Sequence, residues 1–439
     1  MNKASFLRHP LVTGTLLLTL AGLLSRVIGF FYRIFLSHTI GAEGLGIYQL
    51  IFPIYALTFS VTAAGIQTAI SKFVAEAAAY EKKERPSGTT YLYAGLSLSL
   101  LLSGLCTILL YRYADVVAVT VLEEVRCAPL LRILSLTVPF GAIHSCINGY
   151  YYGLQKTAVP ALSQLVEQFA RVGGVLLIYH ISMEQNRPVT INMAVWGLVL
   201  GEIASVLYCV SVTRVKRGHD HFLRASRQVF TMAIPLTANR VLVNLFQSAE
   251  AILIPGRLRS YGYESQEALS VYGVLTGMAM PMVLFPSVIT NSVAVMLLPA
   301  ISEAQAKNDK HYIRNSVKKS CFYCITLGLG CTLLFLLAGK ALGRIVFANE
   351  LAGTFIIVLG WICPFLYLTT TLSSIINGLG KTTTTFLLNL FGSGIRIFFV
   401  VFLLPLLGIK AYLWGMLVSH LAISGTAVLI LRRILWSRK

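Results

Sequence analysis

The stretch SRVIGFFYRIFLS, residues 25–37, lies in an apolar run that begins at Leu11 and has the length of a membrane-spanning helix. Two arginines, Arg26 and Arg33, interrupt this run. An arginine at the centre of a spanning helix costs about 2.5–3.5 kcal/mol on insertion scales, so such residues usually have a function. The stretch therefore predicts a transmembrane helix with a specialised polar face.

The composition of the whole chain is that of a polytopic membrane protein. Of its 439 residues, 56% are hydrophobic and 12% are charged, whereas soluble domains are about a quarter charged. The N-terminus resembles a signal peptide, but the apolar pattern continues past Ser25 with no small-residue cleavage motif, so we expect an uncleaved first span. The apolar runs are too long for barrel strands and lack a period of two.

Stretches of about 20 apolar residues predict transmembrane helices. Twelve such spans are predicted, at 11–36, 45–69, 91–111, 127–152, 157–180, 191–213, 229–254, 269–298, 317–338, 354–376, 382–404 and 409–431.

The net charge of +19 would suit a nucleic-acid partner, but its distribution indicates membrane topology instead. With the N-terminus inside, most Lys and Arg outside the spans fall in predicted cytoplasmic segments, which include 72–85, 214–227, 307–319 and 432–439. This is the positive-inside pattern, and it also attracts anionic lipid headgroups. We therefore expect both termini in the cytoplasm, membrane lipid as a partner and no nucleic acid.

The chain contains an internal repeat. GLQKT at 153–157 matches GLGKT at 378–382, and each motif precedes an arginine at the same spacing, Arg171 and Arg396. Six spans in each half return the chain to the same side, so the halves are predicted to be parallel repeats. Chance similarity between apolar helices is the alternative.

The repeat predicts the domain organisation. An N-terminal six-helix lobe is expected at 1–213, a basic cytoplasmic linker at 214–228 and a C-terminal six-helix lobe at 229–439. The predicted fold is thus all-α, with twelve transmembrane helices in two lobes around a central cavity. GLGKT is not a nucleotide-binding loop, because that loop requires glycine where Ile375 stands.

The two arginines of the opening stretch are seven residues apart, which is two helical turns, so they share a face. In the matching seventh span the corresponding face carries Arg240, Asn244 and Gln247. Such faces point into a bundle interior or a watery cavity. Arginine suits bidentate contact with phosphate, so these five residues are the predicted substrate-binding set for a phosphate-bearing anion.

The other intramembrane arginines are predicted to be structural or coupling residues. Arg171 has Glu167 four residues away on the same helix face, which predicts an ion pair. Arg396 has Gly392 at the matching place, so its partner is not predicted. Arg132 lies near the outer end of its span and is expected to reach the interface.

The remaining intramembrane polar groups are read as follows. Glu202 lies in the middle of a span and is either a proton- or cation-coupling group or a hydrogen-bonded structural residue. Glu250 lies near the outer end of its span, where contact with water is the simple expectation, and His144 is interpreted as a satisfied packing residue rather than a relay. Cys321 and Cys324 lack the further ligands of a zinc set. No catalytic motif is present, so neither enzyme activity, a metal nor a cofactor is predicted.

Three segments carry a family resemblance. GLLSRVIGFFYRIFLSHTIGAEGLGIYQLIFPIY (22–55), AISKFVAEA (69–77) and INGYYYGLQKT (147–157) resemble the stage V sporulation protein B group of the multidrug/oligosaccharidyl-lipid/polysaccharide (MOP) exporter superfamily. The resemblance implies two six-helix lobes of the MATE type, alternating access and a location in the bacterial plasma membrane. Related lipid II flippases carry arginines on their first helix, where Arg26 and Arg33 stand here. Those relatives often have fourteen helices, whereas twelve are predicted in this chain.

The expected function is a flippase, acting as a monomer, that moves an undecaprenyl-pyrophosphate-linked saccharide, such as a cell-wall precursor, to the outer leaflet. One alternative is a drug or cation antiporter of the same superfamily, which would place acids rather than arginines in the cavity. Another is a membrane assembly factor that does not transport. A membrane glycosyltransferase would need a carboxylate-bearing loop, which is not found.

Overall fold

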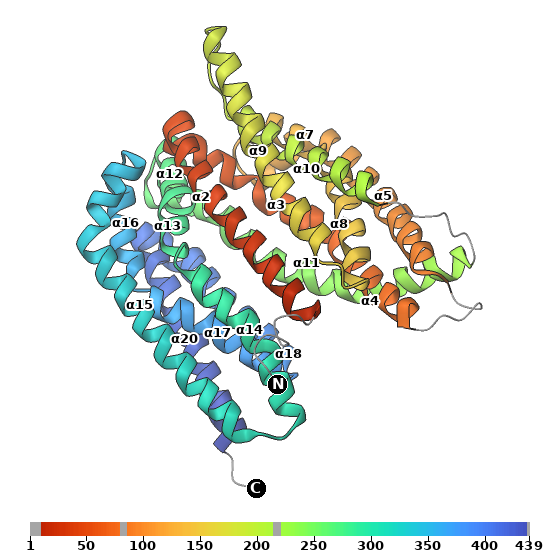
Figure 1. Cartoon of the computed structure of the whole chain (residues 1–439). Helices are drawn as coiled ribbons and strands as arrows, with labels where there is room; N and C mark the ends of the chain where they lie inside the picture. The colour runs from red at the N-terminus through yellow and green to blue at the C-terminus, as the bar shows by residue number, and fades with distance from the viewer. Residues whose placement is uncertain (1–9, 80–85, 214–220, 437–439) are drawn as a thin grey trace. The chain divides into compact units, whose positions relative to one another are not determined.

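The computed structural model describes residues 10–79, 86–213 and 221–436, and this part of the chain is helical throughout, with no strand (Figure 1). Ten of its helices are long and apolar enough to cross a membrane, or up to twelve if two bent pairs each form one span. These findings confirm the predicted all-α membrane fold. Residues 214–220 of the predicted linker and 80–85 of the basic segment 72–85 lie outside the described residues.

The helices of the first half follow the predicted spans. They are α2 (Pro10–Leu50), α3 (Phe52–Phe59), η1 (Ser60–Ala64), α4 (Gly65–Ala79), α5 (Gly88–Arg112), α6 (Ala114–Val116), η2 (Val117–Val121), α7 (Cys127–Ser135), α8 (Thr137–Gly153), α9 (Ala158–Glu184) and α10 (Asn192–Val212). Gly41 kinks α2 with a φ of 68°, a left-handed conformation that glycine adopts without strain. The kink separates the predicted spans 11–36 and 45–69.

The second half repeats much of this order, except that it has no counterpart of η2 before α16 and has an additional π turn, η4, after α18. It contains α11 (Phe222–Tyr261), α12 (Ser265–Gly273), η3 (Val274–Ala279), α13 (Met280–Leu284), α14 (Ser287–Ala306), α15 (Lys310–Phe347), α16 (Glu350–Gly360), α17 (Cys363–Gly378), α18 (Thr382–Phe398), η4 (Phe399–Leu403), α19 (Leu404–Leu407) and α20 (Ile409–Trp436). Several helices extend beyond the apolar runs, because backbone groups keep their hydrogen bonds when a helix continues. Residues 222–228 of the predicted linker are therefore part of α11.

Each half contains one sharply bent helix pair. Helices α7 and α8 meet at 41°, and α16 and α17 meet at 57°. Pro139 and Pro364 lie just after the two bends and occupy matching positions, 225 residues apart. Proline removes a helical donor and so favours a bend there.

A threonine from a neighbouring helix satisfies a freed carbonyl at each bend. Thr107 on α5 donates to the carbonyl oxygen of Ser135 at 3.1 Å, and Thr332 on α15 donates to that of Gly360 at 2.7 Å. Donors and acceptors are again each 225 residues apart. Broken spanning helices need such partners, because lipid offers no hydrogen bonds. The repeat therefore extends from the sequence to the hydrogen bonding of each half.

The glycines of the repeated motifs allow close helix packing. A Cβ atom at Gly153 would lie 2.6 Å from the carbonyl oxygen of Ser71, and one at Gly378 would lie 2.9 Å from that of Leu298. Both distances are too short for any side chain. The GLQKT and GLGKT motifs thus mark the ends of α8 and α17, where each helix crosses its neighbour at contact distance.

The described residues contain four π-helical turns, η1 to η4; η1, η3 and η4 lie within predicted spans, and η2 lies between two of them. A π turn has i→i+5 hydrogen bonds and holds one residue more than the α turn that it replaces. In the first half η1 leads into α4, and in the second half η3 leads into α13.

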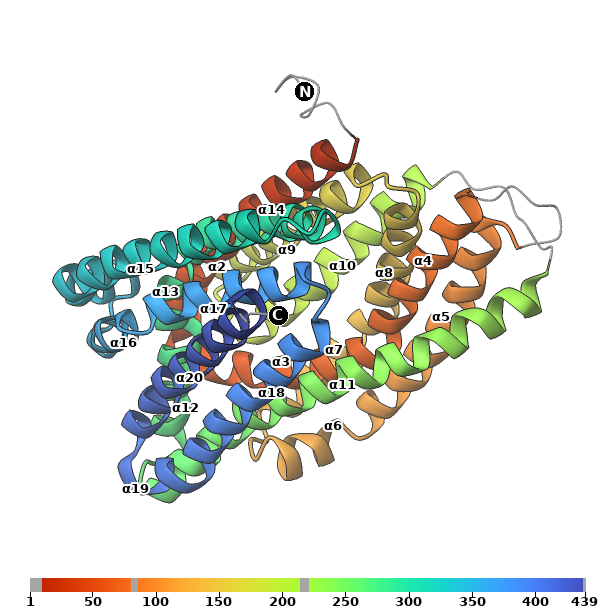
Figure 2. The same ribbon diagram turned by 90° about the horizontal axis from the view of Figure 1, so that it is seen from below.

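The chain forms two compact units. Unit 1 contains the chain up to Tyr32 together with Leu50–Ser248, and unit 2 contains Arg33–Gln49 together with the chain from Ala249 onward. Helices α2 and α11 contribute residues to both units; α11 is the long yellow-green helix of Figure 2. The division into lobes 1–213 and 229–439 remains a prediction.

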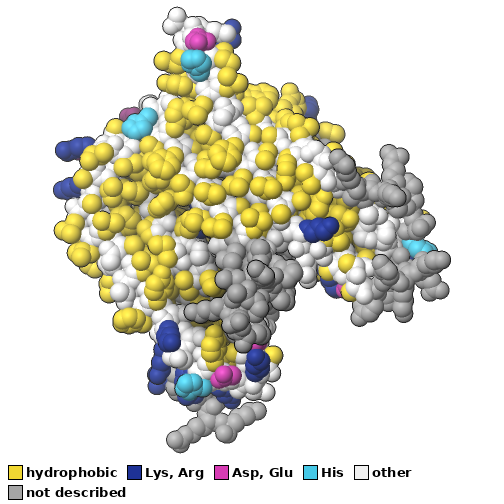
Figure 3. All heavy atoms as spheres, in the orientation of Figure 1, with side chains coloured by type: hydrophobic (Ala, Val, Ile, Leu, Met, Phe, Trp, Pro, Cys, Tyr) yellow, Lys and Arg dark blue, Asp and Glu magenta, His cyan; other side chains and the backbone are white. Residues whose placement is uncertain are grey.

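The surface of the helices matches a bilayer environment. Figure 3 shows hydrophobic side chains over most of the visible faces of α14 and α15, while Lys and Arg gather near the ends of these two helices. The large apolar side chains exposed on α15 include Phe322, Leu333 and Leu337. In water such a surface would drive association, whereas in lipid it is the expected one.

Candidate functional site

The predicted cationic face lies on α2. Arg26 is exposed and Arg33 partly exposed, two turns apart on the same helix. Gly22 and Gly29 share this face; a Cβ atom at Gly22 would meet no atom within 4 Å, and one at Gly29 would meet only the Gln168 side chain, at 3.2 Å. There is therefore open space beside the helix at Gly22, whereas at Gly29 the Gln168 side chain packs closely against it.

The six intramembrane arginines divide into two groups. Arg132 pairs with Asp115 at 2.5 Å, Arg171 with Glu167, and Arg396 with Glu250 at 2.8 Å. In residues 10–79, 86–213 and 221–436, no ion pair joins a carboxylate to the other three arginines, Arg26, Arg33 and Arg240. Structural pairing thus accounts for three arginines and leaves the predicted binding arginines without a counter-ion in the described chain.

The predicted polar face of α11 is only partly available. Arg240 and Gln247 are exposed. Asn244 instead donates its amide to the Ser60 hydroxyl, and lies 3.4 Å from the Ala56 carbonyl oxygen. It therefore fastens α11 to the helix that carries η1. A role for these three residues in substrate binding remains a prediction.

A second polar cluster lies inside unit 1, where α8, α9 and α10 meet. Glycines bring α9 and α10 together: a Cβ atom at Gly201 would lie 2.9 Å from the Glu167 carbonyl oxygen, and one at Gly197 would lie 3.2 Å from that of Arg171. This close approach places Glu202 on α10 beside Glu167 and Arg171 on α9. The predicted ion pair of Arg171 with Glu167 is present.

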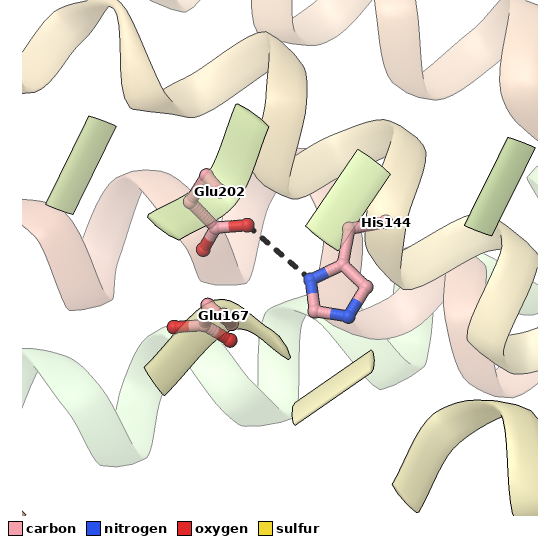
Figure 4. A group of neighbouring side chains, drawn as sticks. All are labelled: His144, Glu167 and Glu202. Carbon is pink, nitrogen blue, oxygen red and sulfur yellow. Dashed lines mark hydrogen bonds and ion pairs between the residues drawn. The ribbon is translucent and has the colours of Figure 1, made fainter. Parts of the chain in front are cut away.

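Glu202 has partners on two other helices. Tyr55 donates to one of its oxygens at 3.0 Å, and His144 Nδ1 lies 3.3 Å from the other (Figure 4). The second ring nitrogen of His144 lies 3.1 Å from the Ser163 hydroxyl. His144 is therefore a satisfied, largely buried residue, and its partners, which were not predicted, make it part of a hydrogen-bonded chain.

The charges of this cluster do not balance when both acids are ionised. Glu167 and Glu202 contribute two negative charges and Arg171 one positive charge, so a proton on His144 or Glu202 would neutralise the set. Buried charge is costly unless it is compensated. Ligand atoms of His144, Glu167 and Glu202 also lie within 4.8 Å of one another, close enough to share a cation. The expectation that the chain binds no metal remains a prediction.

A third cluster, in unit 2, contains the partner that Arg396 lacked in the sequence. Its Nε donates to both oxygens of Glu250, at 2.8 and 2.9 Å, and its Nη1 donates to Ser419 at 3.0 Å. Tyr412 donates to the same carboxylate at 2.9 Å. The expectation that Glu250 contacts water is wrong: the residue is 7% exposed, because three helices close over it.

Sequence reasoning missed the two tyrosines that hold the buried acids. Tyr55 and Glu202 are 147 residues apart, and Tyr412 and Glu250 are 162 apart, so no local spacing connects them. One signal was available: an acid in the middle of a span needs donors, and a tyrosine hydroxyl within another span is a natural one.

Comparison with known proteins identifies the family. A model described as "Polysaccharide biosynthesis protein" matches residues 11–305. The chain belongs to this polysaccharide biosynthesis protein family. A second model, MatE, matches residues 229–402, so the two matches together cover most of the chain.

Similar proteins include members with descriptive names. Stage V sporulation protein B of Bacillus subtilis is 30% identical, over 93% of this chain and 80% of the relative. Lipid II flippase MurJ of the same organism is 22% identical, over 74% of this chain and 64% of the relative. A multidrug resistance MATE family transporter of the MOP superfamily, solved in an inward-facing conformation, has a TM-score of 0.73 at 17% identity, over 94% of each chain.

These comparisons confirm the resemblance noted in the sequence. This family member is a multi-pass membrane protein with a MATE-like fold, and one of its relatives is a lipid II flippase. The solved MATE transporter bears on the fold alone, because its sequence identity is low.

Proposed function

We propose that this polysaccharide biosynthesis family protein is a flippase that moves an undecaprenyl-pyrophosphate-linked saccharide from the inner to the outer leaflet. The observation that carries the proposal is the contrast among the arginines: Arg26 and Arg33 have no acid partner in the described chain, whereas three other intramembrane arginines do. A pyrophosphate would supply the missing negative charge and accept bidentate hydrogen bonds from guanidinium groups.

The remaining steps follow from this assignment. Arg240 and Gln247 would contribute to the same headgroup from α11, with Asn244 holding that helix in place. The polyprenyl tail would stay in lipid while the headgroup crosses by alternating access. The protein would act as a monomer in the bacterial plasma membrane, with both termini cytoplasmic, where its basic segments lie.

The buried cluster of Glu202, His144, Glu167 and Arg171 is the proposed coupling site of this flippase. It has one acid more than it has arginines, so one added proton would balance its charges. The Glu250–Arg396 cluster is already neutral as a pair and is assigned a structural role. An intramembrane acid with an exchangeable proton is typical of transporters that use a proton gradient.

Complementation tests the substrate assignment. Cells depleted of their lipid II flippase would receive the wild-type gene, the double variant Arg26→Ala/Arg33→Ala, or Arg344→Ala. Arg344 is a matched control, because it forms an exposed ion pair with Glu350; the two side chains are 75% and 81% exposed. We expect rescue by the wild type and by the control but not by the double variant, with equal amounts of each protein in the membrane.

The same cells separate the alternatives. An assembly factor would rescue with both arginines removed, and that result would exclude the proposed site. A cation antiporter would not rescue but would lower the accumulation of a cationic dye, the more so once the repelling arginines are gone.

The double variant Arg26→Lys/Arg33→Lys tests bidentate binding, since lysine keeps the charge and loses the planar fork; we expect it to rescue poorly.

A further inference from the structure

Unit 2 carries an apolar groove that none of the roles above uses. The groove lies between the α16–α17 pair and α20, has a volume of about 610 Å³ and contains a single charged side chain, that of Lys410. Figure 2 shows α20 running beside α17, and contacts join these helices. Its lining includes Val358, Trp361, Phe365, Lys410, Trp414 and Leu421.

The groove owes its position to the bend between α16 and α17. Trp361 lies in the turn between them, where the axis changes direction by 57°. Its indole is 55% exposed, and that of Trp414 on α20 is 61% exposed, so two large aromatic side chains flank an open space. In the first repeat Leu136 takes the place of Trp361, 225 residues earlier. When α10 and α20 are matched at Trp196-Gly197 and Trp414-Gly415, Asn192 takes the place of Lys410. The combination of Trp361 and Lys410 is therefore specific to the second half.

The length of the groove matches one leaflet of a bilayer. From Lys410 to Leu421 is eleven residues of α20, or roughly 16 Å at the helical rise of about 1.5 Å per residue. Half of a hydrocarbon core of about 30 Å is nearly the same distance. Lys410 lies in the first turn of α20. With this turn at the membrane boundary, Leu421 would reach the depth of the bilayer centre.

We propose that this groove binds one anionic phospholipid of the leaflet in which α20 begins, with the phosphate at Lys410 and one acyl chain along the indoles and leucines. Charge complementarity supports the headgroup position, because no carboxylate pairs with Lys410 among the residues the structure describes. Tryptophan is the residue that favours the interface, where an apolar chain joins a polar head.

The observations favour a phospholipid over the polyprenyl chain of a transport substrate. A single lysine is a point charge that suits one phosphate, whereas a pyrophosphate is better matched by paired arginines. The groove is as long as one leaflet, and a polyprenyl chain would extend well beyond it. The site does not depend on the proposed flippase activity, so the two assignments can fail separately.

Native mass spectrometry of the purified full-length protein tests this site. The probes are phosphatidylglycerol and phosphatidylcholine with identical acyl chains. We expect the wild type to bind one phosphatidylglycerol more tightly than phosphatidylcholine, and Lys410→Gln to lose about fivefold in affinity for phosphatidylglycerol, the effect of one lysine near a membrane surface. Lys340→Gln, a matched exposed lysine on α15 outside the groove, should bind as the wild type does.

Filling the groove gives a second measurement. Leu417→Trp should reduce binding of both lipids, because the larger side chain takes the place of the acyl chain. Lys410→Arg should retain the preference for phosphatidylglycerol, because it keeps the positive charge. Retention would show that the loss in Lys410→Gln comes from the missing charge and not from a general effect of substitution at this position. Unchanged phosphatidylglycerol binding by Lys410→Gln would overturn the proposal. So would displacement of phosphatidylglycerol by an equal concentration of undecaprenyl phosphate, which would assign the groove to a polyprenyl lipid.

Discussion

Arg171 and Arg396 occupy matching places in the two repeats but take their counter-charges from different sources. Arg171 uses Glu167, one turn away on its own helix, whereas Arg396 uses Glu250 from α11. Gly392 stands where a repeat of Glu167 would be. The arginine thus occupies the same sequence position in both halves, whereas its acid partner lies on the same helix in one half and on a different helix in the other.

The Glu250–Arg396 pair predicts a large stability effect. Glu250→Gln leaves a guanidinium group uncompensated in a closed site, and removing one partner of a buried pair costs about 3–5 kcal/mol. We expect a marked fall in the midpoint of unfolding in a fixed detergent. Glu350→Gln, which breaks the exposed pair with Arg344, should leave that midpoint nearly unchanged. Equal midpoints for the two variants would contradict a buried pair.

The turns after α8 and α17 offer a matched test of backbone strain. Gln155 and Gly380 are 225 residues apart and both have a left-handed backbone, with φ of 58° and 75°. A side chain at such a position costs about 1–2 kcal/mol. Gly380→Ala should therefore destabilise the protein by about 1 kcal/mol through backbone strain. No steric clash adds to this cost, because the new Cβ atom would meet no atom within 4 Å.

The reciprocal change is the control for this strain. Gln155→Gly should be neutral or slightly stabilising, because it relieves the strain but increases the freedom of the unfolded chain. Both variants would be compared by unfolding in mixed micelles of increasing denaturing detergent. A stabilising Gly380→Ala would show that the left-handed turn is absent.

At the scale of elements, the two bent helix pairs depend on hydrogen bonds from their neighbours. Each bend frees a carbonyl oxygen inside the bilayer, and Thr107 or Thr332 on the adjacent helix provides the donor. The Thr332 distance is typical of a hydroxyl donor, and the Thr107 distance is slightly longer. The bends are thus fixed by packing between helices and not by the prolines alone.

Removing these hydroxyl groups tests that dependence. Thr107→Val and Thr332→Val keep the shape of the side chain but leave the carbonyl oxygen of Ser135 or Gly360 without that donor. Each should lower stability by about 1–3 kcal/mol, the cost of an unsatisfied buried group. Thr354→Val is the control, because the Thr354 hydroxyl bonds only to Glu350 of its own exposed turn. Calorimetry in the same micelles gives the comparison.

The elements also show how far the sequence could predict this fold. Apolar runs were enough to predict the spans, and the i, i+4 spacing was enough to predict the ion pair of Glu167 with Arg171. The partners of Glu202, Glu250 and Arg396 lie on distant helices, and no local pattern connects them. Only the 225-residue repeat, had it been extended to Thr107 with Thr332, would have revealed the hydrogen bonds at the bends.

At the scale of the whole molecule, two compact units carry polar clusters with different charge balance. The cluster of unit 1 has one acid in excess, and that of unit 2 pairs one acid with one arginine. Under the proposed function, the first would change its charge during a transport cycle while the second would stay constant. The proposal therefore links the energy source to the cluster of unit 1.

Transport assays can detect that link. In vesicles that flip a fluorescent lipid-linked saccharide, collapsing the proton gradient should slow the wild type. Glu202→Gln should be slow in both conditions and insensitive to the gradient, because the amide cannot exchange a proton. Glu303→Gln, in an exposed pair with Lys307, should retain the response of the wild type. Full gradient dependence in Glu202→Gln would exclude this residue as the coupling group.

The four π-helical turns have a consequence for how such helices can move. Each π turn holds one extra residue. When a π turn shifts along its helix, the segment between its old and new positions rotates by about 100°, the angle of one residue. Helix α4, which follows η1, can in this way present a different row of side chains while both its ends stay where they are. A helix with a π turn can therefore change the face that it presents in steps of one residue, without unwinding.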